Sequence, residues 1–284
     1  MNRVIKLKKR ATVYIEPTSP FNFQGTFIKP SHFPSRLIVC DNGEIFQSIE
    51  IGRDVLGLKI FNLRCATPKI GVAIYAKKTV SEAVKETVRS EITFRYNLDG
   101  NIQDFIDRFK KDSLLAGPIK RWAGMRPSIA YYLYGFLMVA TVLQNATVKR
   151  TVQMMNALLE KYGKKLIFAR KEVYAIWSSK DIEKAPEAEL RSLRIGYRAK
   201  NLKRISEFFL DNPNSERDFR AISDRQTLKK SLLEIYGVGP QSVSYLLFEA
   251  FHFYDALDHL SPWEGKIVSM LLYGNKNAGQ KQIL

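Results

Sequence analysis

The sequence predicts an α+β protein in which a small antiparallel β-sheet domain precedes a mostly helical body. Two observations support this fold class. Up to about residue 76, short runs of β-branched and aromatic residues alternate with Gly, Pro, Asp and Asn. From about Thr79 onward, the apolar residues recur at the helical spacing of three to four. The change of period divides the 284-residue chain into a strand-rich beginning and a helix-rich remainder.

The expected strands lie between turn-forming residues. Asp41-Asn42-Gly43, which separates the first two, is a typical hairpin turn. The runs that predict strands cover residues 36–40, 44–51, 58–64 and 71–75. With a flanking helix, these strands form the predicted N-terminal antiparallel β domain, residues 1–98.

The helical region is expected over residues 99–284. Gly117-Pro118 and Arg126-Pro127 are predicted to interrupt it, because Pro removes a backbone donor and Gly weakens a helix interior. The segments that predict helices are 80–96, 102–111, 128–144, 148–162, 171–178, 187–193, 200–210, 227–235, 240–253 and 262–273.

The chain is strongly basic. Lys and Arg total 45 against 28 Asp and Glu, which gives a formal net charge of +17. This excess creates a positive field that attracts polyanions such as DNA, RNA or an anionic membrane surface. The cationic residues recur along the whole chain instead of forming one tail, so charge alone does not choose among these partners.

Cysteine usage and hydrophobicity exclude several classes of protein. The chain has two cysteines, Cys40 and Cys65, and no CxxC pair, which argues against a disulfide scaffold, a four-cysteine zinc site and an iron–sulfur cluster. The most apolar stretch, residues 129–143, is too short to span a bilayer and is expected to be a buried helix. We therefore expect an intracellular protein with no membrane partner.

The most informative segment is LLEIYGVGPQSVSY, residues 232–245. Gly237 and Gly239 permit a tight turn between two helices, Val238 can point inward to lock them together, and Pro240 occupies a favoured first helical position. Such a turn presents backbone N–H groups at a positive helix N-terminus, where a phosphate can bind. An ordinary corner between two helices would have a similar local sequence.

This segment resembles the DNA-binding hairpin of the helix-hairpin-helix (HhH-GPD) DNA glycosylase superfamily, over about 227–253 here, with Gly237, Val238, Gly239 and Ser242 on the DNA backbone. In that superfamily a catalytic aspartate follows the hairpin by about twenty residues. Asp258 lies 19 residues after Gly239, in a predicted catalytic loop and helix over 254–274. Asp255 is the competing carboxylate, three residues earlier.

The resemblance also assigns roles to residues outside the hairpin. Leu193-Arg-Ile-Gly-Tyr-Arg-Ala-Lys200 is similar to a G-Y-R-A element of 8-oxoguanine and archaeal glycosylases, and Pro20-Phe-Asn-Phe23 to the opening of their sheet domain. A glycosylase must flip its target base out of the stack and fill the gap. The resemblance implies that Asn145 fills that gap with Tyr197 beside it, and that Arg198 or Arg150 meets the orphaned partner base.

The residue at position 241 indicates whether the protein can form a covalent intermediate with the sugar. Bifunctional relatives carry a lysine two residues after the second hairpin glycine, which forms a Schiff base with the sugar. Gln241 stands there and cannot do so, and Lys266 is the nearest alternative amine. An ionised Asp258 beside the sugar can instead stabilise the cationic transition state and orient water. The prediction is a monofunctional glycosylase.

The expected base pocket contains Tyr245, Gln241, Trp263 and Phe21. Tyr245 matches a base-stacking tyrosine of the 3-methyladenine DNA glycosylase II family, and an aromatic face favours electron-poor alkylated bases. Alkylated purines are thus the expected substrates. The alternatives are 8-oxoguanine excision with lyase activity, and a non-catalytic DNA-binding protein.

The implied partner is double-stranded DNA with damaged bases, bound by a monomer. No metal site is expected and no cofactor, apart from a monovalent cation that the hairpin turn could hold. The resemblance to archaeal enzymes places the protein in the cytoplasm or nucleoid of a prokaryote.

Overall fold

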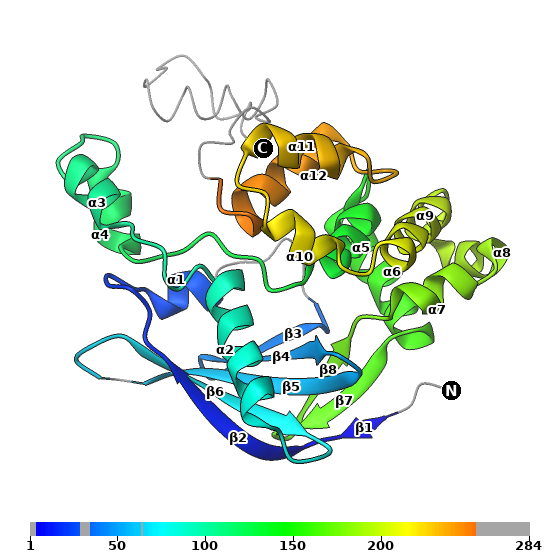
Figure 1. Ribbon diagram of the computed structural model, residues 1–284, viewed down its shortest axis with the longest axis horizontal. Helices are drawn as coiled ribbons and strands as arrows, with labels where there is room; N and C mark the ends of the chain where they lie inside the picture. The colour runs from blue at the N-terminus through cyan, green and yellow to red at the C-terminus, as the bar shows by residue number, and fades with distance from the viewer. Residues whose placement is uncertain (1–3, 29–34, 64, 254–284) are drawn as a thin grey trace.

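A computed structural model describes residues 4–28, 35–63 and 65–253. Its larger sheet has the strand order β2-β6-β5-β4-β3, with every neighbouring pair antiparallel. The strands are β2 (Lys8–Ile15), β3 (Ile38–Asp41), β4 (Glu44–Ile51), β5 (Asp54–Leu63) and β6 (Lys69–Ala76). Apart from α1 (Phe23–Phe27), which lies between β2 and β3 in the chain, the helices follow the sheet and lie mainly to one side of it (Figure 1). The predicted α+β fold class is confirmed.

Helix α2 (Glu82–Arg95) closes the core of this sheet. Ser81 caps it by accepting a hydrogen bond from the amide of Val84, and Val88 and Ile92 are completely buried against the strands. The short helix α1 (Phe23–Phe27) covers another part of the same core, where Phe27 packs on Tyr96 with ring centroids 4.1 Å apart. The sequence did not indicate α1, because five residues give too little periodicity.

A second sheet joins the start of the chain to its middle. Strand β1 (Ile5–Lys6) pairs in parallel with β7 (Lys164–Phe168), which pairs antiparallel with β8 (Lys171–Ala175). The prediction of a helix over 171–178 is therefore wrong. Consecutive residues of β8 are buried on both faces, between the two sheets and the helical core, so the strand shows no alternation by which to recognise it. A division of the chain after residue 98 stays a prediction.

The predominantly apolar helix α5 (Leu133–Leu143) lies at the centre of the helical body. Leu137, Met138 and Val142 are at most 1% exposed, which explains why this helix is hydrophobic all round. Within the described part of the chain, no helix is long and apolar enough to cross a membrane. The other helical segments are α3 (Gln103–Phe109), α4 (Ala116–Trp122), α6 (Val148–Lys161), α7 (Ser179–Lys184), α8 (Glu187–Leu190), η1 (Arg191–Ile195), α9 (Arg198–Asp211), α10 (Ser215–Arg220), α11 (Arg225–Leu233), α12 (Pro240–Tyr245) and η2 (Leu246–Ala250).

Two further expectations need correction. Gly117-Pro118 does not interrupt the helical region but lies in the first turn of α4, where a missing proline N–H costs nothing. Residues 128–132 are not helical, and α5 begins only at Leu133. The predicted helix over 262–273 lies outside the described residues.

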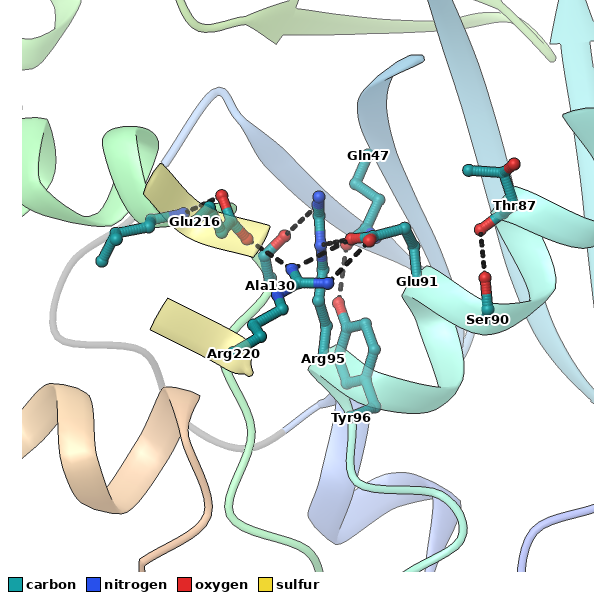
Figure 2. Close-up of polar contacts among 10 residues, drawn as sticks. Gln47, Thr87, Ser90, Glu91, Arg95, Tyr96, Ala130, Glu216 and Arg220 are labelled. Atoms are coloured by element: carbon teal, nitrogen blue, oxygen red, sulfur yellow. Dashed lines mark hydrogen bonds and ion pairs between the residues drawn. The ribbon is translucent and has the colours of Figure 1, made fainter. Parts of the chain in front are cut away.

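A cluster of ion pairs fastens α2 to the helical body (Figure 2). Glu91 accepts hydrogen bonds from Arg95 (2.9 Å) on its own helix and from Arg220 (2.7 and 3.2 Å) on α10. Arg220 also pairs with Glu216, whose other oxygen accepts the amide of Leu133 (2.8 Å). Burial alone would raise the pKa of Glu91, but Arg220 and Arg95 outweigh it and hold that pKa below its ordinary value.

Candidate nucleic-acid interface

The hairpin between α11 and α12 has the geometry that its sequence predicts. Gly237 adopts a left-handed φ of +78°, Val238 is buried and donates its amide to the carbonyl of Ile235 (3.0 Å), and Pro240 opens α12. The carbonyl of Gly239 accepts the first intrahelical bond, from Val243 (3.0 Å). The amides of Gln241 and Ser242 precede that bond, so helix geometry leaves them without an intrahelical acceptor.

The backbone conformation and the surroundings of the two hairpin glycines differ. A Cβ on Gly237 would meet the Asn201 side chain of α9 at 3.3 Å, in a conformation that L-residues rarely adopt. A Cβ on Gly239 would meet nothing within 4 Å, and its φ of −92° suits any residue. The fold therefore explains Gly237, whereas open space at Gly239 is consistent with a ligand that approaches the backbone there.

Asn145 and Tyr197 lie together although 52 residues separate them in the sequence. Asn145, between α5 and α6, has a left-handed φ of +48°, which Asn tolerates. Its side-chain amide donates to the Tyr197 hydroxyl (3.2 Å), and that hydroxyl donates to the carbonyl of Gln144 (3.5 Å). Asn145 and Tyr197 are both exposed, so the pair is available at the surface.

The two arginines predicted to meet an orphaned base both donate to backbone carbonyls. Arg198 is buried, stacks on Tyr197 with its guanidinium carbon 4.8 Å from the ring centroid, and donates to the carbonyl of Gln144. Arg150 donates to the carbonyl of Arg194. The backbone of Arg194 has a positive φ of 61°. Both guanidinium groups thus support backbone loops here, and their contact with a base stays a prediction.

Gln144 connects the pair to the hairpin. Its side-chain amide donates to the carbonyl of Gly237 (3.4 Å), while its own carbonyl receives bonds from Tyr197 and Arg198. The hairpin, the α5–α6 loop and the start of α9 therefore form one continuous surface. Gln144 and Asn201 were missed at the sequence level because their roles depend on contacts with residues far along the chain.

The predicted base-pocket residues come from separate elements. Tyr245 ends α12 with 36% of its surface exposed, and Gln241 is exposed one turn earlier. Phe21 is half-buried against the core of the large sheet, beside Gly124. Trp263 and the predicted catalytic Asp258 lie outside the described residues, so their placement stays a prediction. In the described ranges, no group of three His, Cys, Asp or Glu side chains could hold a metal ion.

Comparison with known proteins agrees with this architecture. Residues 138–277 match the family model of the HhH-GPD superfamily of base excision DNA repair proteins. A 3-methyladenine DNA-glycosylase from Archaeoglobus fulgidus has a similar structure, with a TM-score of 0.75 and 14% identity over 95% of this chain and 90% of that one. No sequence among the curated proteins matches the chain.

A Clostridium acetobutylicum 8-oxoguanine glycosylase/lyase is also similar. Its apo-form gives a TM-score of 0.67 and 19% identity over 99% of this chain and 91% of that one. Its complex with dsDNA containing cytosine opposite to 8-oxoG gives 0.65 and 18%, over 98% and 89%. At such identities the likeness is one of fold. Residues 138–277 therefore resemble the HhH-GPD superfamily of base excision DNA repair proteins, and the chain shares the fold of these glycosylase structures.

Proposed function

We propose that the protein is a monofunctional DNA glycosylase that flips an alkylated purine, such as 3-methyladenine, out of duplex DNA and hydrolyses its N-glycosidic bond. The single observation that carries this proposal is the continuous surface formed by the hairpin and the Asn145–Tyr197 pair. The hairpin offers amides for a phosphate, and the pair offers a polar wedge for the gap that the flipped base leaves. A DNA-binding protein without catalytic activity would need the hairpin amides but not a polar wedge.

The proposed reaction places Asp258 beside the exposed sugar. As the glycosidic bond breaks, positive charge develops on the sugar, and an ionised carboxylate stabilises that charge and orients the attacking water. Gln241 is the residue at the position where the bifunctional relatives carry their lysine. An amide cannot form a Schiff base with the sugar, so the expected product is an intact strand with an abasic site.

The expected preference for alkylated purines rests on Tyr245. Its exposed ring on α12 offers an aromatic face near the hairpin, and such a face attracts a positively charged base through cation–π interaction. The fold likeness to the 3-methyladenine enzyme is compatible with this choice. The likeness to the 8-oxoguanine enzyme and the Gly196-Tyr197-Arg198 segment favour the second candidate, 8-oxoguanine excision.

One assay separates these possibilities. Duplexes carrying a 3-methyladenine analogue, hypoxanthine, 8-oxoguanine or uracil are incubated with the wild type and with Asp258→Asn, then analysed with and without alkali. We expect alkali-dependent strand breaks at the alkylated base for the wild type only, and no covalent adduct after borohydride. If no base is released by the wild type, the protein is not a glycosylase of these bases. Alkali-independent breaks with an adduct would instead indicate a lyase.

A further inference from the structure

The large sheet carries one group of cations at a single end of two paired strands. Lys8, Lys9 and Arg10 begin β2, and Lys77 and Lys78 directly follow β6; we call these five residues the basic edge. In the register of the strands, Lys8 lies opposite Ala76 and Lys9 opposite Tyr75, so the two halves of the group are neighbours. All five side chains are exposed.

Lys59 and Lys69 of the same sheet, and two lysines of the neighbouring strands β7 and β8, each have an acidic partner. The pairs are Lys59–Glu44 (2.8 Å), Lys69–Glu16 (2.9 Å), Lys164–Glu50 (2.7 Å) and Lys171–Asp41 (2.9 Å). Within the described residues, no member of the basic edge forms an ion pair. Glu82 and Glu86, the next acids along the chain, are bound by Lys85 and Arg89. Five neighbouring positive charges therefore repel one another without compensation inside the protein.

Arg10 is held in place for an external acceptor. Its Nε donates to the carbonyl of Ala76 (3.4 Å), and one terminal nitrogen donates to the carbonyl of Lys77 (2.8 Å), which fixes the guanidinium across both strands. A guanidinium has five N–H donors in a planar fork that suits phosphate, and two bonds leave several of them directed elsewhere. The flanking lysines add flexible charges around this fixed group.

The basic edge lies far from the hairpin. In Figure 1 the start of β2 and the end of β6 are at the bottom of the molecule, and α11 and α12 are at the top, with the sheet and α10 between them. Duplex DNA is stiff on the scale of one protein. A duplex that lies against the hairpin therefore does not also run along the basic edge.

We propose that the basic edge is a second, sequence-independent binding surface for the phosphate backbone of duplex DNA, which holds another DNA segment while the hairpin holds the first. The five side chains supply charge without a hydrophobic anchor, which favours a polyanion over a folded protein partner. The choice of DNA as that polyanion rests on the proposed function. Two such surfaces on one monomer would let the protein transfer between DNA segments without being released.

A bridging assay tests this proposal with the full chain. An undamaged duplex is fixed on beads, and capture of a second, fluorescent duplex is measured as salt is raised. We expect the wild type to capture it, and K8E/K9E/K77E/K78E to capture at least about tenfold less. When log K for the second duplex is plotted against log salt concentration, the loss of four phosphate contacts should make the slope less steep by up to about 3.6. The milder K8Q/K9Q/K77Q/K78Q should show a smaller loss in the same direction.

A charge-matched control distinguishes an effect of the basic edge itself from an effect of the lower net charge of the protein. K111E/K120E/K180E/K184E changes the formal charge equally, at exposed lysines on other elements, and should bridge like the wild type. Equal capture by wild type and K8E/K9E/K77E/K78E, or equal loss in the control, would overturn the proposal. Binding of the basic edge to phosphatidylserine vesicles without capture of a second duplex would also overturn it. Base excision is measured in parallel, because its absence would refute the proposed function without affecting the bridging result.

Discussion

Replacement of Gly239 by alanine tests whether the open space at the hairpin turn belongs to a ligand. The new Cβ would have no heavy atom within 4 Å, and the backbone, with φ −92° and ψ 172°, is one that alanine adopts freely. Stability should therefore change by less than about 1 kcal/mol, because alanine reduces the freedom of the unfolded chain but is a poorer N-cap residue than glycine. A phosphate at the turn would meet the new methyl group and lose a charge-assisted hydrogen bond, worth about 1.5–3 kcal/mol. The expected result is a Kd for duplex DNA about 10- to 150-fold weaker.

The measurement pairs urea unfolding with DNA binding by fluorescence anisotropy. Gly117→Ala is the matched control, since a Cβ there would also meet nothing within 4 Å, in α4. It should leave DNA binding unchanged and raise stability by up to about 1 kcal/mol, because alanine favours a helix over glycine. Gly237→Ala provides the opposite case, because its left-handed φ and the Asn201 contact at 3.3 Å should cost about 1–2 kcal/mol of folding stability. If Gly239→Ala binds DNA as tightly as the wild type, the argument about the open space is refuted.

Three other predictions follow from the described contacts. Glu91→Gln removes the carboxylate shared by Arg95 and Arg220 and should cost about 2–3 kcal/mol, reduced from the fully buried value because the side chain is 22% exposed. Since the folded pKa of Glu91 is lowered, its contribution is present above the ordinary value of 4.5 and lost as pH falls through the folded pKa, so the deficit measured by urea unfolding should shrink in acid. Tyr96→Phe leaves the buried Gln47 oxygen without its 2.6 Å donor and should lower the free energy of unfolding by about 1–3 kcal/mol; no change would show that water replaces the hydroxyl. Asn145→Ala should lower the free energy of unfolding by about 1 kcal/mol, because a φ of 48° suits asparagine better than alanine, and should slow single-turnover base excision at least about tenfold. Equal excision rates would remove Asn145 from the proposed wedge.

The sequence predicted local structure most accurately where several short-range signals agree. The hairpin could be recognised because Gly237, Val238, Gly239 and Pro240 each satisfy a local requirement of one turn. The sheet could be recognised because its strands alternate with strong turn residues. By contrast, β8 has buried residues on both faces and was taken for a helix, and α4 was missed because Pro118 lies in its first turn, where it does no harm.

Asn145 and Tyr197 show the limit of what the sequence alone predicts. Resemblance selected Asn145 and Tyr197, but no local pattern contains the 3.2 Å contact between them. Gln144, which joins that pair to the hairpin, was not singled out at all, and neither was Asn201. These roles depend on how α5, α9 and α11 pack, and packing is decided by the sum of many weak contacts across the core.

By itself, the sequence determined the fold class, the strongly basic character, the hairpin and the amide at position 241 in place of a lysine. These features follow from residue types and from spacings shorter than one helix or turn. Only the tertiary structure decided that β1 pairs with β7 about 160 residues later, and that Arg198 turns inward to a loop carbonyl. It also decided that five cations gather at one end of the sheet, with no ion pair to any residue that the structure describes. Such features join residues distant in the chain, where the free energy of the whole fold decides which side chains meet.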